Sequence, residues 1–421
     1  MTAATRTSGF YGWRVVGAAF VLGVFGWGLG FYGPPVFLSV IRETTGWPLA
    51  LISTAVTVHF LVGAISGANL PAIHRRFGAA RATQAGALAM AAGLIGWATA
   101  VAPWQLFAAA LLSGAGWGAM SAAALNAIVS PWFVRARPAA LAMAYNGGSV
   151  GGIVFSPLWV VAIGALGFPA AALAVGVVMA LTIWILSELV FSRTPEGMGQ
   201  GPDGDAPGAA AASVTAISAR PLPGRLLWRD RGFLTLAAGM ALGLFAQIGL
   251  TAHLFSLLVP TLGAQQSGLA MALVTVMAIA GRTLTGRAMP PGADRRLIAC
   301  AGYAAQLAGS VVFVLAAGTS VPMLLLGVVL FGIGFGNATS LPPLIAQVEF
   351  AKEDALRAVA LIVGIAQGAF AFAPAAFGLI RTFAPQAAGA APGEAPFFFA
   401  AAALVQGLAI VGFLAGRRRD C

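Results

Sequence analysis

The sequence predicts an all-α membrane protein with twelve transmembrane helices, arranged in two pseudo-symmetric halves of six. Of its 421 residues, 59% are hydrophobic and only 8% are charged, whereas soluble domains carry about 25% charged residues. The apolar residues form long runs near the roughly 20 residues that a spanning helix needs, and they do not alternate as the strands of a membrane barrel would. A long polar stretch divides these runs into two sets.

The first set contains six apolar runs, separated by charged, proline-rich or glycine-rich breaks. They lie near residues 13–40, 47–72, 80–101, 104–131, 138–165 and 169–191. The first run continues past signal-peptide length, so we expect it to be the first helix of the protein. The second set contains six runs near residues 232–260, 264–289, 296–317, 320–349, 355–383 and 396–415.

Between the two sets lies a stretch rich in Gly, Pro, Asp and Ala, without the periodic apolar pattern of a packed element. We therefore expect an N-terminal half over residues 1–191, a mobile linker over 192–231 and a C-terminal half over 232–421. With this linker in the cytoplasm, every basic residue falls on the cytoplasmic side except Arg42, Arg282 and Arg381. The positive-inside rule thus predicts cytoplasmic termini, in a membrane of the bacterial inner-membrane type.

The basic residues and the cysteines exclude some classes of partner. The net charge of +11 comes from short segments between apolar runs, so it indicates topology and not nucleic-acid binding. Cys300 and Cys421 form no disulfide framework and have no metal-ligand spacing. We expect the lipid bilayer as the surroundings of the chain, and neither a cofactor nor a metal.

The two halves share an internal repeat in their glycine and proline positions. The fourth run contains LLSGAGWG and the tenth contains LLFGIGFG. Pro157, expected to interrupt the fifth helix, has a counterpart in Pro374 of the eleventh. Glycine and proline are common in spanning helices, so chance is the alternative, but six-plus-six topology independently predicts this pairing. The paired glycines are Gly114, Gly116 and Gly118 in the first half and Gly332, Gly334 and Gly336 in the second.

Six plus six helices around a central linker resemble the major facilitator superfamily over nearly the whole chain. Residues 131–152, PWFVRARPAALAMAYNGGSVGG, are similar to the helix 4–5 signature of the monocarboxylate transporters and the oxalate/formate antiporters, and the YGW at residues 11–13 points the same way. The loop PAIHRRFGAAR departs from the superfamily, with Pro71 and Arg75 where a Gly and an Asp would fall. The equivalent loop after helix 8 retains only Asp294 as its acid. Such loops lock one conformation through charge pairing, so the resemblance leaves these contacts open.

Arg282 is the strongest candidate for substrate contact. It is the only basic residue expected in the middle of a helix, where burying a charge costs roughly 2.5–3.5 kcal/mol and calls for a function or a specific partner. A guanidinium presents a planar fork that matches a carboxylate. The resembling families use an arginine in this helix to hold the substrate carboxylate. The alternative is a structural arginine that binds backbone carbonyls.

His253, in the seventh run, is expected to reach the same central cavity. Bacterial relatives of the monocarboxylate transporters have a histidine in this helix near the substrate, and titration near neutral pH would let it sense or relay a proton. A hydrogen-bonded packing histidine is the alternative. His59 is a weaker candidate for proton coupling, and a structural role is favoured for it. Further candidates for substrate contact, each of which could equally join helices, are Tyr32, Ser121, Asn126, Gln247, Asn337 and Gln367.

Charged residues at the cytoplasmic helix ends predict a gate. Glu349 closes the tenth run beside Lys352 and Glu353, where a solvated helix end or an intracellular gate explains it better than a proton site. The residues predicted for this gate are Arg75, Arg76, Arg135, Arg137, Asp294 and Glu349.

Residues that the chain lacks narrow the predicted substrate. The helix 1 lysine and the helix 8 acid of animal monocarboxylate transporters fall on Pro35 and Ala278, and helix 11 has Gln367 in place of the lysine of the oxalate antiporters. One fixed cation balances one carboxylate better than two. We therefore predict a monoanion, carried by proton symport or anion exchange through a monomer. The alternatives are efflux of a neutral or amphipathic compound, with Arg282 structural, and, further off, a membrane enzyme or receptor, for which no catalytic set or signalling domain is visible.

Overall fold

The computed structural model describes residues 10–205, 227–289, 293–350, 352–384, 391 and 393–417. Within these ranges every regular element is a helix, which confirms the predicted all-α fold class. Most of the predicted linker, including Arg220 and Arg225, lies outside the described residues, as do Arg418 and Arg419 at the C-terminus.

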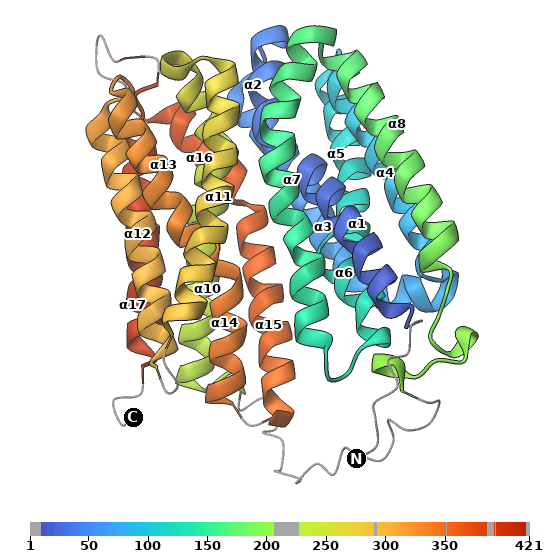
Figure 1. The fold of residues 1–421 in the computed structure, drawn as a ribbon. Coiled ribbons are helices and arrows are strands. Elements are labelled where there is room, and N and C mark those ends of the chain that lie inside the picture. The colour runs from blue at the N-terminus through green and yellow to red at the C-terminus, as the bar shows by residue number, and fades with distance from the viewer. Residues whose placement is uncertain are drawn as a thin grey trace.

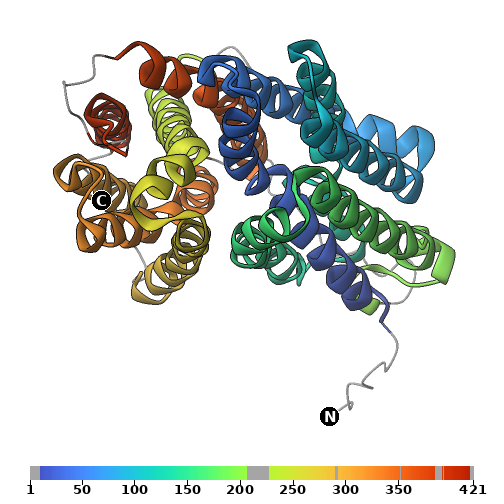
Figure 2. The same ribbon diagram turned by 90° about the horizontal axis from the view of Figure 1, so that it is seen from above.

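Two helical bundles stand side by side (Figures 1 and 2). The N-terminal bundle consists of α1 (Gly12–Gly30), α2 (Gly33–Thr45), α3 (Leu49–Phe77), α4 (Ala79–Thr99), α5 (Pro103–Met120), α6 (Ala122–Val129), α7 (Arg137–Leu166) and α8 (Phe168–Leu186). The short turns η1 (Ser130–Trp132), η2 (Ser187–Phe191), η3 (Glu196–Met198) and η4 (Pro202–Gly204) belong to its edge and to the start of the linker. The C-terminal bundle consists of α10 (Arg231–Leu262), α11 (Ala264–Ala288), α12 (Arg295–Ala316), α13 (Val321–Phe335), α14 (Asn337–Glu349), α15 (Lys352–Ala371), α16 (Ala373–Phe383) and α17 (Pro396–Ala415).

Eleven helical segments of the described chain are long and apolar enough to span a membrane. In this count α1 with α2, α5 with α6, α13 with α14 and α15 with α16 each form one segment. α4 is a further helix of 21 residues that packs against α5 and α8. Arg81, Thr83 and Gln84 lie near its start. The structure is therefore close to the predicted twelve spanning helices.

Several spanning segments are broken near their middle. α1 ends at Gly30 and α2 begins at Gly33, followed by Pro34 and Pro35, and α16 begins at Ala373 with Pro374 directly after it. Proline lacks the N–H that would continue the helical ladder, so it suits the first turn after a break. Pro157 differs, because it lies inside the unbroken α7. The prediction that it interrupts this helix is wrong, since packing between spanning helices can accommodate a proline.

The repeated glycines make the same close contacts in both halves. On α5, Gly114 and Gly118 approach α3, while Gly116 between them approaches Met90 on α4. On α13, Gly332 approaches α11 and Gly334 approaches α12, with Gly336 again directed at α11. Added methyl groups at these positions would collide with backbone atoms or side chains of the neighbouring helix. The glycine repeat therefore marks one packing arrangement that occurs twice.

The halves meet through a limited set of helix pairs. α7 packs on α11, α3 on α15 and α16, and α2 on α10. α2 and α16 lie at the upper edge of Figure 1, whereas α14 and the start of α15 lie at the lower edge. We call the lower edge the basic side, because the loops after α3 and α6 carry their arginines there; the upper edge is the opposite side. The contacts between halves that α2 and α16 make therefore belong to the opposite side.

Candidate functional site

Arg282 lies on α11, the helix through which the C-terminal half faces α7. Its Nε donates a hydrogen bond to the carbonyl oxygen of Gly336, at 3.1 Å. Within the described part of the chain, its two terminal nitrogens have no protein acceptor and no carboxylate within ion-pair distance. The guanidinium is thus held by one edge, and the other edge keeps donors for a ligand.

The break between α13 and α14 supplies the acceptor for Arg282. Gly336 lies at this break, and an added methyl group there would collide with the backbone carbonyl of Ala278 on α11. Only a glycine lets the break between α13 and α14 approach α11 so closely. Its carbonyl also accepts a bond from the Ser340 hydroxyl at 3.2 Å. Backbone packing therefore fixes where the guanidinium lies.

Tyr32 brings the N-terminal half to the same place. It lies at the break between α1 and α2 and is buried. Thr275 precedes Arg282 on α11 by about two helical turns. On α7, a methyl group added to Gly152 would lie 2.6 Å from the Tyr32 ring and 2.7 Å from Thr275 Oγ1. The absence of a side chain at Gly152 permits this contact between halves.

Asn337 adds an amide beside the arginine. It follows Gly336 directly, and its Nδ2 donates to Thr285 Oγ1 at 2.9 Å. Its Oδ1 is buried without a hydrogen-bond partner in the described structure. Buried acceptors of this kind are normally satisfied, so a ligand donor or a water is the expected partner. Arg282, Tyr32 and Asn337 are thus the predicted residues that the structure brings together, and we call them with Thr275 the Arg282 site.

His253 lies in a different cluster, on the opposite side. Its Nε2 is 3.0 Å from the carbonyl oxygen of Pro374, and its Nδ1 is 3.4 Å from a terminal nitrogen of Arg381. A carbonyl only accepts and an arginine only donates, so Nε2 carries the proton and Nδ1 accepts. The ring is therefore neutral and engaged at both nitrogens. His253 was expected to reach the same central cavity as Arg282, but the structure places it beside Pro374 and Arg381 and does not bring it to the Arg282 site.

Arg381 is a residue that the sequence analysis overlooked. It was assigned only to the external side, but the same terminal nitrogen donates to Ser256 Oγ at 2.7 Å, which connects α16 to α10. The side chain is partly buried, and no ion pair with a carboxylate engages it in the described residues. The available signal was its place inside the apolar run 355–383, two residues before the end of that run.

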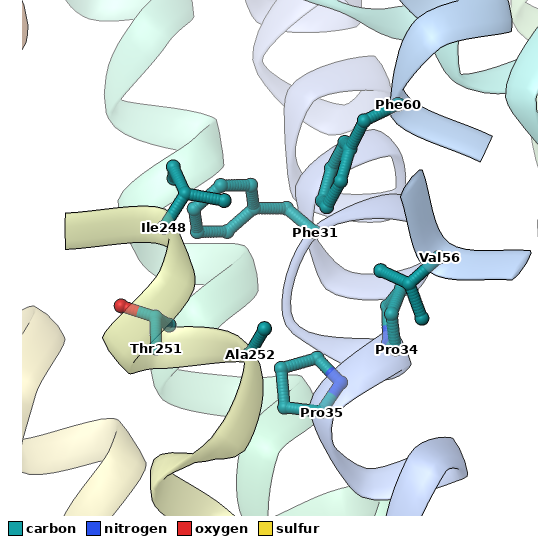
Figure 3. Close-up of a pocket in the computed structure, with 8 residues that line it drawn as sticks. All are labelled: Phe31, Pro34, Pro35, Val56, Phe60, Ile248, Thr251 and Ala252. Atoms are coloured by element: carbon teal, nitrogen blue, oxygen red, sulfur yellow. The ribbon is translucent and has the colours of Figure 1, made fainter. Parts of the chain in front are cut away.

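Mostly apolar side chains close the interface between the halves next to this cluster (Figure 3). Phe31, Pro34, Pro35, Val56 and Phe60 from the N-terminal half face Ile248, Thr251 and Ala252 from α10 around a hollow of only about 10 Å³. This is about the volume needed for one water molecule. Nearby, the backbone N–H of Ala375 donates to Thr57 Oγ1 across the halves, at 3.1 Å. The halves are therefore tightly joined here.

Comparison with known proteins decides the family. A family model described as Major Facilitator Superfamily matches residues 18–374. The chain belongs to the major facilitator superfamily. No curated protein sequence matches it significantly. Membership points to a membrane transporter of a small molecule and not to an enzyme.

Solved structures of superfamily transporters share this fold. A mutant of the nucleoside transporter NupG aligns with a TM-score of 0.71 over 96% of this chain and 100% of its own, at 13% identity. A bacterial homologue of the human lysosomal transporter Spinster, in an inward-facing and occupied conformation, aligns with a TM-score of 0.70 over 98% of this chain and 100% of its own, at 14% identity. Identities this low establish the fold alone.

His59 and Gln247 take part in bonds inside one half of this superfamily fold. His59 Nδ1 lies 2.8 Å from Ser113 Oγ, and its Nε2 lies 2.9 Å from the carbonyl oxygen of Gly30. Gln247 accepts from Gln306 Nε2 at 3.1 Å, in a buried ladder that continues through Ser310. Both patterns are typical of interhelical hydrogen bonding. The structure does not bring either residue to the Arg282 site.

The remaining candidates for substrate contact lie elsewhere. Ser121 is buried at the break between α5 and α6, where its hydroxyl donates to the carbonyl of Gly118 at 3.0 Å. Asn126 is exposed and contacts the hydroxyl of Ser130. Gln367 lies partly buried on α15. Their roles in substrate contact stay predictions. Among the described residues, no group of three or more potential ligands could hold a metal ion.

Four of the six predicted gate residues, Asp294, Glu349, Arg135 and Arg137, bind within one half or to the linker. Glu349 pairs with Arg296 at 2.6 Å, and Asp294 pairs with Arg417. Burial raises the pKa of Asp294, but the Arg417 hydrogen bond, the N–H groups of Leu297 and Arg296 and the Arg417 charge outweigh this, so the pKa is lowered. Gating by these residues stays a prediction, because the described contacts do not join the halves.

The loop after α6 is bound by the first part of the linker. Arg135 pairs with Asp205 at 2.9 Å, while the Asp203 carboxylate accepts bonds from the backbone N–H groups of Val134, Arg135 and Ala136. Burial raises the pKa of Asp203, and these backbone bonds together with the Arg135 charge lower it further than burial raises it. Arg137 donates instead to the carbonyl of Phe133 at 2.8 Å.

Proposed function

We propose that this protein is a secondary transporter of a small organic anion, a monocarboxylate, that works by alternating access of its two halves. The observation that carries the proposal is the state of Arg282, whose Nε is anchored to Gly336 while its terminal nitrogens are unpaired in the described structure. A carboxylate would accept both remaining donors in bidentate geometry. Tyr32 from the N-terminal half meets Thr275 of α11 at Gly152, about two helical turns from Arg282, so a bound anion would contact both halves.

The electrostatics of the site favour a monoanion. Arg282 has no second arginine or lysine in the described contacts around it. The other intramembrane arginine, Arg381, is engaged with Ser256 and faces His253. One fixed cation offsets the desolvation of one carboxylate better than that of two. This supports the resemblance to the monocarboxylate transporter branch over a dicarboxylate specificity.

Proton symport and anion exchange both fit this arrangement. In symport, His253 would take up a proton when the opposite side opens and Arg381 moves away from its Nδ1, because removal of the adjacent positive charge favours the imidazolium. The His59 ring is bonded within the N-terminal half to Ser113 and Gly30, with no neighbouring arginine among these partners, and is the weaker proton candidate. In exchange, a second anion would replace the first one at Arg282, and no proton would be carried.

The basic side supports a cytoplasmic orientation of both termini and the linker, under the positive-inside rule. We propose a bacterial-type inner membrane as the location and a monomer as the working unit, with residues 1–191 and 232–421 as the moving halves. The gate would form on the basic side, from Arg75, Arg76 and the other residues predicted for it.

One observation favours a second function. The Arg282 bond to the Gly336 carbonyl is what a purely structural arginine would make, and one neighbour in fold is described as a nucleoside transporter. Efflux of a neutral or amphipathic compound is therefore the alternative, in which Arg282 only stabilises the break between α13 and α14.

Thermal unfolding with a panel of small carboxylates separates these functions. We expect at least one monocarboxylate to raise the melting temperature of the wild-type protein, because a ligand that binds the folded state stabilises it with occupancy. The Arg282→Ala variant should show no shift, while Arg357→Ala, which removes an exposed arginine of α15, should respond as the wild type does. Unchanged carboxylate uptake into vesicles by Arg282→Ala would support the alternative. Conversion of a ligand without its translocation would indicate an enzyme.

A further inference from the structure

A groove on the N-terminal half is lined by none of the residues of the Arg282 site. It lies between α3 and α4 near the basic side, with α5 as its floor, and has a volume of about 500 Å³. Ten of its eleven lining residues lack a charge, and the exception is Arg81. The lining residues are Ser66, Leu70, Ile73 and Phe77 of α3, Arg81, Ala82, Ala85, Gly86 and Ala89 of α4, and Ala115 and Ala119 of α5.

Small residues create this groove. α3 and α4 each pack closely on α5 but have few contacts with each other. Gly86 of α4 approaches Ala119 of α5, so α4 packs closely on α5 and the space between α4 and α3 stays open. α4 otherwise packs on α8 of its own half. In the described structure the groove is therefore on the side of the N-terminal half that faces away from the Arg282 site.

The dimensions of the groove match one leaflet. The α3 wall runs from Ser66 to Phe77, which corresponds to about 16 Å of helix. The hydrocarbon core of a bilayer is about 30 Å thick, so the groove is about as long as one layer of acyl chains. Phe77, at its mouth, is 53% exposed, which suits contact with lipid.

Arg76 and Arg81 lie beside the groove without an acidic partner in the described structure, and Arg75 is adjacent to Arg76 in the sequence. Arg75, Arg76 and Arg81 are exposed, and none of them forms an ion pair in the described structure. The guanidinium of Arg76 lies 5.2 Å from the centre of the Phe77 ring, which places it beside the groove. Between Glu43 and Glu188 the chain contains no Asp or Glu.

Glu188 does not neutralise this cluster, because its carboxylate accepts a hydrogen bond from Gln84 at 2.7 Å and has no ion pair with Arg81 in the described residues. An anion from outside the protein would lower the repulsion among the three arginines. A groove that is apolar, as long as one leaflet and flanked by arginines at one end is complementary to an anionic phospholipid.

We propose that this groove binds an anionic phospholipid, with one acyl chain between α3 and α4 and the phosphate between Arg76 and Arg81. The long arginine stems follow the apolar wall while the charged heads reach the phosphate level. The lipid supplies the negative charge at the α3–α4 loop that the chain itself lacks. This proposal does not depend on which substrate is carried.

Lipid-dependent thermal unfolding of the detergent-purified full chain tests the proposal. Phosphatidylglycerol and phosphatidylcholine with identical acyl chains are titrated separately, and inorganic phosphate is titrated alone. We expect phosphatidylglycerol to raise the melting temperature at a concentration about tenfold lower than phosphatidylcholine, and phosphate to have no effect. In the double variant Arg76→Gln/Arg81→Gln this difference should vanish. The matched control Arg14→Gln/Arg193→Gln, which removes two exposed arginines elsewhere, should retain it.

A second variant tests the groove separately from its charge. Ala85 is exposed and lines the groove, so Ala85→Phe fills the acyl site while all three arginines remain. We expect it to raise the phosphatidylglycerol midpoint about tenfold. Equal stabilisation by the two lipids, stabilisation by phosphate alone, equal loss in the control variant, or an unchanged midpoint in Ala85→Phe would each overturn the proposal.

Discussion

The break between α5 and α6 and the break between α13 and α14 are equivalent in the two halves, yet only one of them carries a charge. In both, alternate glycines let the helix approach two neighbours in the same order. At the first break the Ser121 hydroxyl donates to the carbonyl of Gly118, inside its own helix. At the second, the carbonyl of Gly336 accepts from Arg282 of α11.

The two breaks therefore share their helix packing but differ in the charged group beside them. The glycine pattern sets the helix spacing and repeats because both halves need the same packing. An intramembrane arginine is costly, and one is sufficient for a monoanion. The C-terminal half therefore supplies the charge, and the N-terminal half supplies Tyr32. A bound anion that contacts both would join the halves, which is what coupling of binding to alternating access requires.

Replacement of Arg282 should give the largest effect, because it removes the only charge that distinguishes the two breaks. We expect Arg282→Ala to weaken carboxylate binding on the order of 100-fold, since charge-assisted bonds contribute roughly 1.5–3 kcal/mol each. Arg282→Lys should recover part of this loss, because it keeps the charge without the planar fork. Titration calorimetry measures both. Equal affinities for wild type and Arg282→Ala would show that the two breaks do not differ in function.

Methyl groups at the glycines test whether the two breaks are equivalent as scaffold. Gly118→Ala and Gly336→Ala should each destabilise the protein by about 1–3 kcal/mol through overpacking, since each added methyl would meet the neighbouring helix. Gly364→Ala is the control, because nothing lies within 4 Å of its added methyl. Only Gly336→Ala should also weaken anion binding, as it displaces the acceptor of Arg282. Thermal melts and binding titrations that show the same loss of affinity in Gly118→Ala would contradict this distinction.

The fold could be predicted from the sequence because each step depended on local properties. Run length and low charge determine spanning helices, and the glycine positions of LLSGAGWG and LLFGIGFG predict the repeated packing. Arg282 could be recognised because the cost of an intramembrane charge is independent of the fold. The continuous α7 was mispredicted, since whether Pro157 breaks the helix depends on the neighbours of the helix.

The rest of the site depends on pairs that are distant in sequence. The separation of His253 from Arg282 follows from the bond of His253 to Pro374 and its approach to Arg381, partners that no local pattern indicates. Gln247 was predicted to contact the substrate, but its side chain accepts a buried hydrogen bond from Gln306. The orphaned Oδ1 of Asn337 likewise appears only in three dimensions.

Removal of one hydroxyl should give a smaller effect and tests the contribution of the N-terminal half. Tyr32→Phe keeps the ring against Gly152 and removes only the hydroxyl that would reach a bound anion. A neutral hydrogen bond contributes about 1 kcal/mol, so we expect carboxylate affinity to fall about fivefold. Tyr145→Phe is the control, since the Tyr145 hydroxyl contacts only the carbonyl of Ala122 at 3.4 Å. No change in Tyr32→Phe would mean that the anion contacts the C-terminal half alone.

The smallest expected effect concerns how the two equivalent helices end on the basic side. After α14, Glu349 pairs with Arg296 inside the C-terminal half, whereas the loop after α6 is bound by Asp203 of the linker. Because the pKa of Asp203 is lowered in the folded protein, its contribution to stability is present above the ordinary aspartate pKa and is lost as pH falls through the lowered value. We therefore expect faster proteolysis of the linker only below about pH 4.

Two substitutions separate the contribution of the backbone bonds that Asp203 accepts from that of the adjacent ion pair between Asp205 and Arg135. Asp203→Asn should make cleavage of the linker fast at neutral pH, because a neutral amide accepts the three backbone bonds more weakly than a carboxylate does. Asp205→Asn, which removes only the exposed pair with Arg135, should change cleavage little, since exposed ion pairs contribute at most about 1 kcal/mol. Cleavage of Asp203→Asn at the wild-type rate would show that the linker does not fasten this end. The two halves would then hold their equivalent helices by the same means, through contacts within each half.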